Sequence, residues 1–160
     1  GDAPAVDLDA EKRLQELVLE LAADGVIASA HDCAEGGLAV CVAESALADS
    51  ENPLGVEIAL ADNLPTVALL FGEAQGRIVV SCAPGRLPAV LAAAGRHGVP
   101  AAAIGRVGQP AGPFVITTPD GEIRAPVGEL AEIYHTAIPR LMDQAPDAAG
   151  GDIEPSASPR

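Results

Sequence analysis

The sequence is nearly devoid of aromatic residues: its 160 residues include no Trp, one Tyr and two Phe. Proteins that bind single-stranded nucleic acids stack the bases on aromatic side chains, so this composition argues against that class. Basic residues are also scarce, with 9 Lys and Arg against 23 Asp and Glu, which gives a formal net charge of −14. Because such a charge repels phosphate backbones and anionic lipids, we expect neither a nucleic acid nor a membrane partner.

Long apolar runs and paired cysteines are missing as well. No stretch is long enough to span a bilayer, and the N-terminus lacks a basic and then apolar signal pattern. The three cysteines, Cys33, Cys41 and Cys82, are odd in number and form no CxxC pair, so neither a zinc site nor a disulfide framework is expected. Free thiols among small apolar neighbours point to the cytoplasm.

The periodicity of the apolar residues predicts an α+β domain. Helical spacing and strand-like runs interleave, and several strands are joined by short turns, which favours a mixed, largely antiparallel sheet packed with helices. Helices are predicted at residues 9–23, 38–48, 84–97 and 127–142, and strands at 26–30, 55–60, 77–82, 101–107, 113–118 and 122–125. Residues 66–71, TVALLF, fit a strand or a helix equally well. The last helix carries an apolar face of Leu130, Ile133, Tyr134, Ile138 and Leu141.

Composition also predicts the organisation of the chain. Residues 1–7 and 144–160 are rich in Pro, Gly, Ala and Ser and lack periodicity, so we expect a flexible N-terminal end, a domain at 8–143 and a flexible tail. The absence of an initiator Met suggests a piece of a longer protein.

The segment SAHDCAEGGLAV (29–40) is the first that could carry chemistry. It takes the chain from a strand to a helix through Gly36 and Gly37, which permit positive φ and a close approach of a ligand to the backbone. The free N–H groups of the new helix favour an anion, and Asp32 could hold a Mg²⁺ ion bound to phosphate oxygens. The alternative interpretation is an aspartate cap and a tight turn.

The segment LFGEAQGRIVV (70–80) is the second. Glu73 and Gln75 stand two apart between glycines, where an extended chain would project both to one side toward a polar ligand. A polar loop is the alternative. The remaining histidines are expected at the surface, and Arg77, Arg106 and Arg124 are expected to pair with surplus carboxylates.

In this order and about forty residues apart, the two segments resemble the last domain of the phosphoribosylformylglycinamidine synthase family. Members typically show AHDCSEGGLAV followed by FGESQxR, and here Ala34 and Ala74 replace the two serines. The resemblance extends from about Leu8 to Met142, including the closing helix. It implies the fold of the AIR synthetase C-terminal domain.

The resemblance also implies a reaction and its participants. The complete subunit of this purine-biosynthesis ligase converts formylglycinamide ribonucleotide to the amidine with ATP, Mg²⁺ and ammonia derived from glutamine. Its partners would be the preceding domains of the same subunit, a glutaminase subunit and a small accessory subunit. Because only a short tail follows residue 142, the glutaminase is expected on a separate chain.

Individual residues take their expected roles from the same resemblance. Asp32 matches a magnesium ligand, and Glu73 and Gln75 match a run that contacts the nucleotide substrate. The other nucleotide or phosphate-binding candidates are His31, Gly36 and Gly37. These matches concern the first of two similar domain copies, whereas this chain resembles the second. No catalytic residue is expected in this fragment, so the isolated domain should be inactive.

Two alternative functions stay open at this point. The domain could belong to a sister ATP-using enzyme: AIR synthetase, selenophosphate synthetase, the hydrogenase maturation factor that dehydrates a carbamoyl group, or thiamine monophosphate kinase. It could also be a self-standing module that senses a nucleotide.

Overall fold

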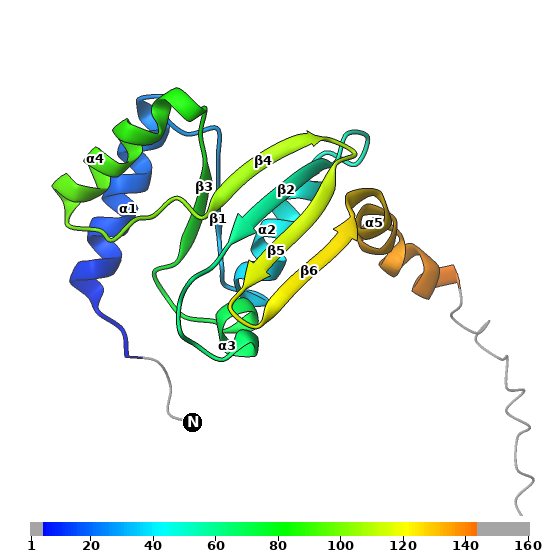
Figure 1. Ribbon diagram of the computed structural model, residues 1–160. Helices are drawn as coiled ribbons and strands as arrows, with labels where there is room; N and C mark the ends of the chain where they lie inside the picture. Colours follow the sequence, from blue (N-terminus) through cyan, green and yellow to red (C-terminus); the bar gives the residue numbers. More distant parts are fainter. Residues whose placement is uncertain (1–4, 144–160) are drawn as a thin grey trace, which may run out of the picture.

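A computed structural model describes residues 5–143, and Figure 1 shows two groups of helices on either side of a narrow β-ribbon. The elements follow one another as α1 (Leu8–Ala23), β1 (Ser29–Asp32), α2 (Gly37–Leu47), β2 (Leu54–Ala59), α3 (Thr66–Phe71), β3 (Ile78–Ser81), η1 (Pro84–Arg86), α4 (Leu87–His97), β4 (Gly105–Pro110), β5 (Pro113–Thr118), β6 (Gly121–Pro126) and α5 (Val127–Asp143). The segment TVALLF is therefore helical. The predicted tail, 144–160, and residues 1–4 lie outside the described residues.

The strands form two sheets. β1 pairs with β3 in an antiparallel ribbon, and a four-stranded sheet has the order β4-β2-β5-β6. In the four-stranded sheet only the β2–β5 pair is parallel, while β2–β4 and β5–β6 are antiparallel. The chain between β2 and β5 passes through α3, β3, α4 and β4, and the turn after β4 reverses its direction, so β5 runs parallel to β2. The prediction of an α+β fold with a mixed, largely antiparallel sheet is confirmed.

Two hydrophobic clusters hold these elements together. The larger lies between the four-stranded sheet and α2, α3 and the start of α5, and the smaller lies between α1 and α4. The ribbon contributes to both, since Val79 packs against the larger cluster and its neighbour Val80 against the smaller. Successive side chains of a strand point to opposite faces, so an unbroken apolar run serves a strand with a core on each side.

Local signals set the ends of the helices. The Asp7 carboxylate caps α1 by accepting from the N–H groups of Asp9 and Ala10, each at 3.0 Å. Gly25, with φ +62°, ends that helix, and Gly98, with φ +64°, ends α4 as the sequence predicts.

The strand predicted at 26–30 is wrong in position and in burial. β1 occupies Ser29–Asp32, with Ala30 opposite Val80, and its residues are exposed or half-buried. Val26 and Ile27 instead pack against the cluster between α1 and α4. The prediction rested on the apolar content of residues 26–30, whereas pairing with β3 decides which residues form the strand.

The last helix forms where it was predicted, but most of its expected apolar face is not buried. Ile133, Ile138 and Leu141 are 63%, 70% and 70% exposed, and only Val127 and Ala131 of α5 are buried. Figure 1 shows why: only the first part of α5 lies against the domain, and the rest extends away from it. Within the described residues, no helix is both long and apolar enough to cross a membrane.

Glu20 on α1 ties this helix to α4 and makes their contact sensitive to pH. Its carboxylate lies 2.7 Å from His97 Nε2 and also accepts from the Arg96 guanidinium. These hydrogen bonds, with His97 first and Arg96 second, lower the pKa of Glu20 below its usual value of 4.5. The carboxylate therefore stabilises the fold above pH 4.5, and that contribution is lost as the pH falls through the lowered value.

We expect the thermal midpoint of Glu20→Gln to lie slightly below that of the wild-type protein near pH 6. The difference should be small, because exposed ion pairs contribute little, and should shrink toward pH 3 as the wild-type carboxyl takes up its proton. Melting curves between pH 3 and 6 test this. The matched control is Glu16→Gln, which removes a longer contact of 3.8 Å to Lys12 on the same helix. A difference in thermal midpoint between wild type and Glu20→Gln that grows as the pH falls would contradict the stabilising role of the Glu20 carboxylate.

Candidate functional site

The two segments singled out in the sequence meet at the start of α2. Gly36 and Gly37 have φ of +75° and +70°, so the positive φ expected of this turn is confirmed. The Gly36 N–H donates to Glu73 Oε1 at 2.8 Å, across 37 positions of sequence. A carboxylate therefore already sits at the helix N-terminus, where the partial positive charge favours an anion.

Gly37 serves the packing between α2 and the end of α3. An added Cβ would lie 2.7 Å from the Phe71 carbonyl carbon and 2.8 Å from Leu70 O. The space beside Gly37 is thus taken by the backbone of α3, which brings the following loop with Glu73 up to the turn.

His31 and Asp32 are the last two residues of β1 and line an open pocket. Its volume is about 320 Å³, and Ala30 and Ile78 complete its lining. The Asp32 side chain is 67% exposed, and its Oδ1 lies 3.6 Å from His31 Nδ1. The pocket thus presents a carboxylate to solvent at the edge of the ribbon.

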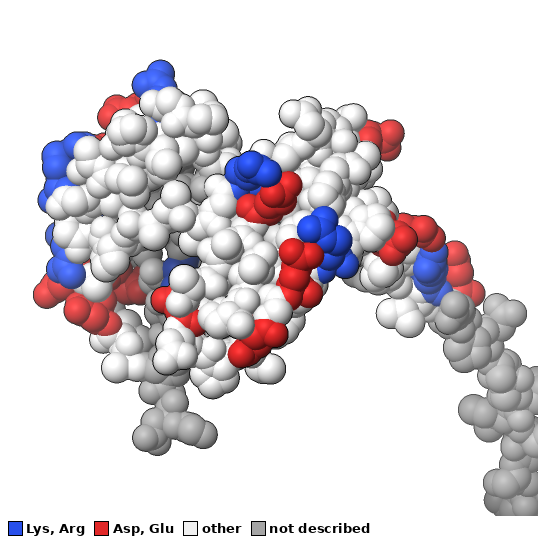
Figure 2. All heavy atoms as spheres, viewed as in Figure 1, with Lys and Arg blue, Asp and Glu red and all other residues white. Residues whose placement is uncertain are grey.

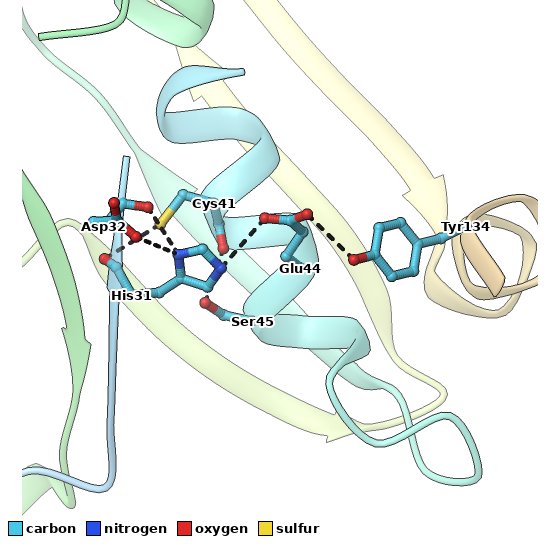
Figure 3. A network of polar contacts seen from close by, with 6 residues as sticks. All are labelled: His31, Asp32, Cys41, Glu44, Ser45 and Tyr134. Carbon is cyan, nitrogen blue, oxygen red and sulfur yellow. Dashed lines mark hydrogen bonds and ion pairs between the residues drawn. The ribbon is translucent and has the colours of Figure 1, made fainter. Parts of the chain in front are cut away.

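The His31 ring is held by contacts on both of its nitrogens (Figure 3). Nδ1 lies 2.8 Å from the main-chain oxygen of Asp32, and because a carbonyl can only accept, Nδ1 is the donor. Nε2 faces Glu44 Oε2 at 3.3 Å, and because a carboxylate only accepts, this contact is attractive where Nε2 also carries a hydrogen. The Tyr134 hydroxyl donates to Glu44 Oε1 at 3.2 Å. The negative charge of Glu44, with this hydrogen bond, raises the pKa of Tyr134, so the phenol remains a donor.

The main chain of His31 is fixed from α2 as well. The Cys41 thiol donates to the His31 carbonyl at 3.5 Å. Burial, reinforced by the neighbouring Cys33 thiol, raises the pKa of Cys41 to about 12. Cys33 and Cys41 are buried free thiols, and Cys41 therefore acts as a packed donor and not as a nucleophile.

The remaining candidates do not join this arrangement. Gln75 is exposed in the turn before β3 and makes no side-chain hydrogen bond within residues 5–143. Nowhere among the described residues do three His, Cys, Asp or Glu side chains gather so that they could hold a metal ion. Asp32 and its neighbours therefore do not fit a Mg²⁺ site by themselves, and a bound ion would need ligands from outside them.

Basic side chains form no patch on the face of the molecule shown in Figure 2, where positive and negative groups lie side by side. Arg106 pairs with Glu57 at 2.7 Å and Arg124 with Glu122 at 2.9 Å, which confirms two of the predicted pairings. The pairing expected of Arg77 is wrong: its guanidinium donates to the Gly72 carbonyl at 3.1 Å.

The sequence did not predict that Glu44 and Tyr134 would lie beside the candidate site. Glu44 is the only charged residue of α2, and a lone carboxylate in an apolar helix is a signal that it meets a partner there. Tyr134 carried no comparable signal, since its place on the apolar stripe of α5 predicted burial rather than a polar contact.

Comparison with known proteins identifies a family that the chain matches. Residues 1–117 match the family described as AIR synthase related protein, C-terminal domain. The chain is 50% identical over 99 residues to phosphoribosylformylglycinamidine synthase subunit PurL of Moorella thermoacetica, covering 62% of this chain and 13% of the relative. It is 39% identical over 160 residues to the subunit of the same name from Symbiobacterium thermophilum, covering 89% and 20%.

Solved structures show the same fold. PurLQS from Thermotoga maritima superposes with a TM-score of 0.71 at 23% identity, covering 81% of this chain and 23% of that one. PurL from Thermotoga maritima in complex with ATP gives a TM-score of 0.68 at 23% identity, covering 79% and 22%. The chain thus spans only 13% to 20% of the length of these curated relatives.

Proposed function

Because the chain belongs to the family of the AIR synthase related protein, C-terminal domain, we propose that it serves as the last domain of a phosphoribosylformylglycinamidine synthase synthetase subunit. Such a subunit would use ATP to convert formylglycinamide ribonucleotide to the amidine with ammonia derived from glutamine. The domain supplies scaffold and interface to this cytoplasmic reaction, and alone it is inactive.

The hydrogen bond from Gly36 N–H to Glu73 Oε1 carries this proposal. It joins the two segments on which the resemblance rests into one local structure, at 2.8 Å. The same segments are separated by 37 positions in the sequence, so their pairing is a property of the fold and not of local sequence.

We propose that a nucleotide or phosphate binds near this bond, with Gly36, Gly37 and Glu73 as candidates at the turn. The other two candidates are His31, at the end of β1, and Gln75, which lies apart from the bond. Asp32 would contribute one exposed carboxylate to a Mg²⁺ ion whose other ligands come from outside the described residues. Since the ligand set is incomplete, we assign the chemistry to the other domain copy.

The partners proposed for the domain are the preceding domains of the same subunit, a glutaminase subunit and a small accessory subunit. The exposed stripe of α5, formed by Ile133, Tyr134, Ile138, Leu141 and Met142, is the surface we assign to the preceding domains. Contiguous exposed apolar side chains mark interaction surfaces, and the chain is a fifth or less of its relatives' length. The negative net charge disfavours a second copy as the occupant.

A chimaeric subunit tests the function directly. In it, this chain replaces the matching domain of the Symbiobacterium thermophilum relative. We expect ADP release that requires both formylglycinamide ribonucleotide and ammonia, and none from the isolated chain. A folded chimaera no more active than the same subunit without the domain would refute the proposal.

Asp32→Asn in this chimaera should leave turnover within about twofold of the unsubstituted chimaera, because removing an exposed carboxylate outside the reacting centre changes little. Glu35→Gln, a change of another exposed carboxylate in the same segment, is the matched control. A loss of several orders of magnitude in Asp32→Asn alone, with the fold intact, would place the working metal site in this domain instead.

A further inference from the structure

The contacts of Glu44 extend the candidate site beyond the two segments described above. Figure 3 shows side chains from three elements meeting: His31 from β1, Glu44 from α2 and Tyr134 from α5. The two oxygens of the Glu44 carboxylate are divided, with Oε2 3.3 Å from His31 Nε2 and Oε1 accepting from the Tyr134 hydroxyl at 3.2 Å. Rotation of the carboxylate would therefore break one contact or the other.

We propose that Glu44 and Tyr134 are positioning residues, which hold the His31 ring at the edge of the candidate site and tie its orientation to helix α5. Glu44 acts on the ring directly, and Tyr134 acts through Glu44. The significance of this link for nucleotide binding rests on the proposed function, but the link itself does not.

The burial of Glu44 explains why its partners matter. Its side chain is 29% exposed, on a helix whose other residues are uncharged. A partly buried carboxylate gains more from hydrogen bonds than an exposed one, and losing a partner leaves it under-solvated. The carboxylate thus favours the arrangement in which both neighbours stay in place.

The backbone around His31 keeps the ring within reach of Glu44. Cys41, one turn before Glu44 on α2, donates its thiol hydrogen to the His31 carbonyl. The Ser45 hydroxyl in turn donates to the Cys41 carbonyl at 2.8 Å. One stretch of α2 therefore contacts both the main chain and the ring of His31. Because Cys41 holds the main chain, a small displacement of the Glu44 side chain would change the orientation of the ring and leave the strand in place.

Helix α5 is anchored where Tyr134 projects. His135 Nε2 lies 3.2 Å from the Leu47 carbonyl at the end of α2, and the Tyr134 and His135 rings meet edge to face with centroids 5.2 Å apart. Beyond this point α5 leaves the domain and carries the exposed apolar stripe. A partner that moves α5 would shift the Tyr134 hydroxyl and, through Glu44, His31.

The chain has only three histidines, so ring nitrogen NMR spectra test the proposal cleanly. Wild-type protein is compared with Tyr134→Phe, Glu44→Gln and the double variant, all without nucleotide. We expect a hydrogen on Nδ1 of His31, and a second one on Nε2 where the contact with the Glu44 carboxylate is formed. We also expect a resolved change of the His31 ring signals in Glu44→Gln, and a smaller change in the same direction in Tyr134→Phe. In the Glu44→Gln background, Tyr134→Phe should have no further effect on His31.

His97, which contacts Glu20 at 2.7 Å on the far side of the domain, is the internal control and should not change. Phe at 134 keeps the ring beside His135, so Tyr134→Phe removes only the hydroxyl and tests the link even if Glu44→Gln folds poorly. Unchanged His31 signals in Tyr134→Phe would overturn the proposal, as would an equal effect of that change with and without Glu44. Because no nucleotide is involved, failure here is distinct from failure of the chimaera.

Discussion

Gly37→Val is expected to destabilise the domain by about 2–6 kcal/mol, the largest effect of any single change considered. A β-branched residue at φ +70° is strained by roughly 1–3 kcal/mol. Its Cβ would also lie 2.7 Å from the Phe71 backbone, and overpacking against atoms that cannot rotate away costs about 1–3 kcal/mol more. Since domains are stable by about 5–15 kcal/mol, much of the margin would be lost.

Gly98→Val separates the two causes. Gly98 has a similar φ of +64°, but an added Cβ there meets nothing within 4 Å. We therefore expect this control to lose only the conformational part, about 1–3 kcal/mol. Urea denaturation of both variants at constant pH gives the comparison. Equal midpoints for the two variants would show that the contact between α2 and α3 is not tight.

Leu141→Asp is expected to weaken association with the preceding domains by at least about 30-fold, equivalent to roughly 2 kcal/mol, because a charge would enter an apolar contact. The partner in this experiment is the Symbiobacterium thermophilum subunit without its matching domain, mixed with this chain, and the dissociation constant is measured by calorimetry. The stability of the chain itself should hardly change, since Leu141 is 70% exposed.

Leu19→Asp is the matched control, because Leu19 is also 70% exposed but lies on α1, away from α5. It should bind like the wild-type chain. Equal weakening by both substitutions would point to a general effect of charge, and no weakening by either would remove α5 from the interface. Dimers of the chain that Leu141→Asp alone dissociates would assign the stripe to a second copy instead.

Periodicity predicted α1 well because this helix carries its own boundaries. Asp7 and Gly25 delimit α1 by a side-chain cap and a positive φ, and both signals are local. The strand near residue 26 was misplaced for the opposite reason, since its extent depends on pairing with β3, about fifty residues away. The exposed stripe of α5 shows a second limit: periodicity reveals an apolar face but not whether this chain covers it.

The candidate site was foreseen in part. The turn at Gly36 and the involvement of Glu73 follow from glycine spacing and from the resemblance, but the hydrogen bond between them needed the fold. The contact of Glu44 with Tyr134 joins residues 90 positions apart, and only packing of α5 against α2 brings them together. The roles of His31, Asp32 and Gln75 toward a nucleotide remain predictions.

Because α1 packs against α4, the apolar face of α1 is buried only late in the synthesis of the domain. Leu17 and Leu21 of α1 are covered by Val90, Ala93 and Ala94, which are made only after α2, α3 and three strands. At the usual rate of about 5–20 residues per second, the apolar face of α1 therefore waits on the order of several seconds for its partner. During that time a nascent chain would present an amphipathic helix, which is the kind of surface that chaperones bind.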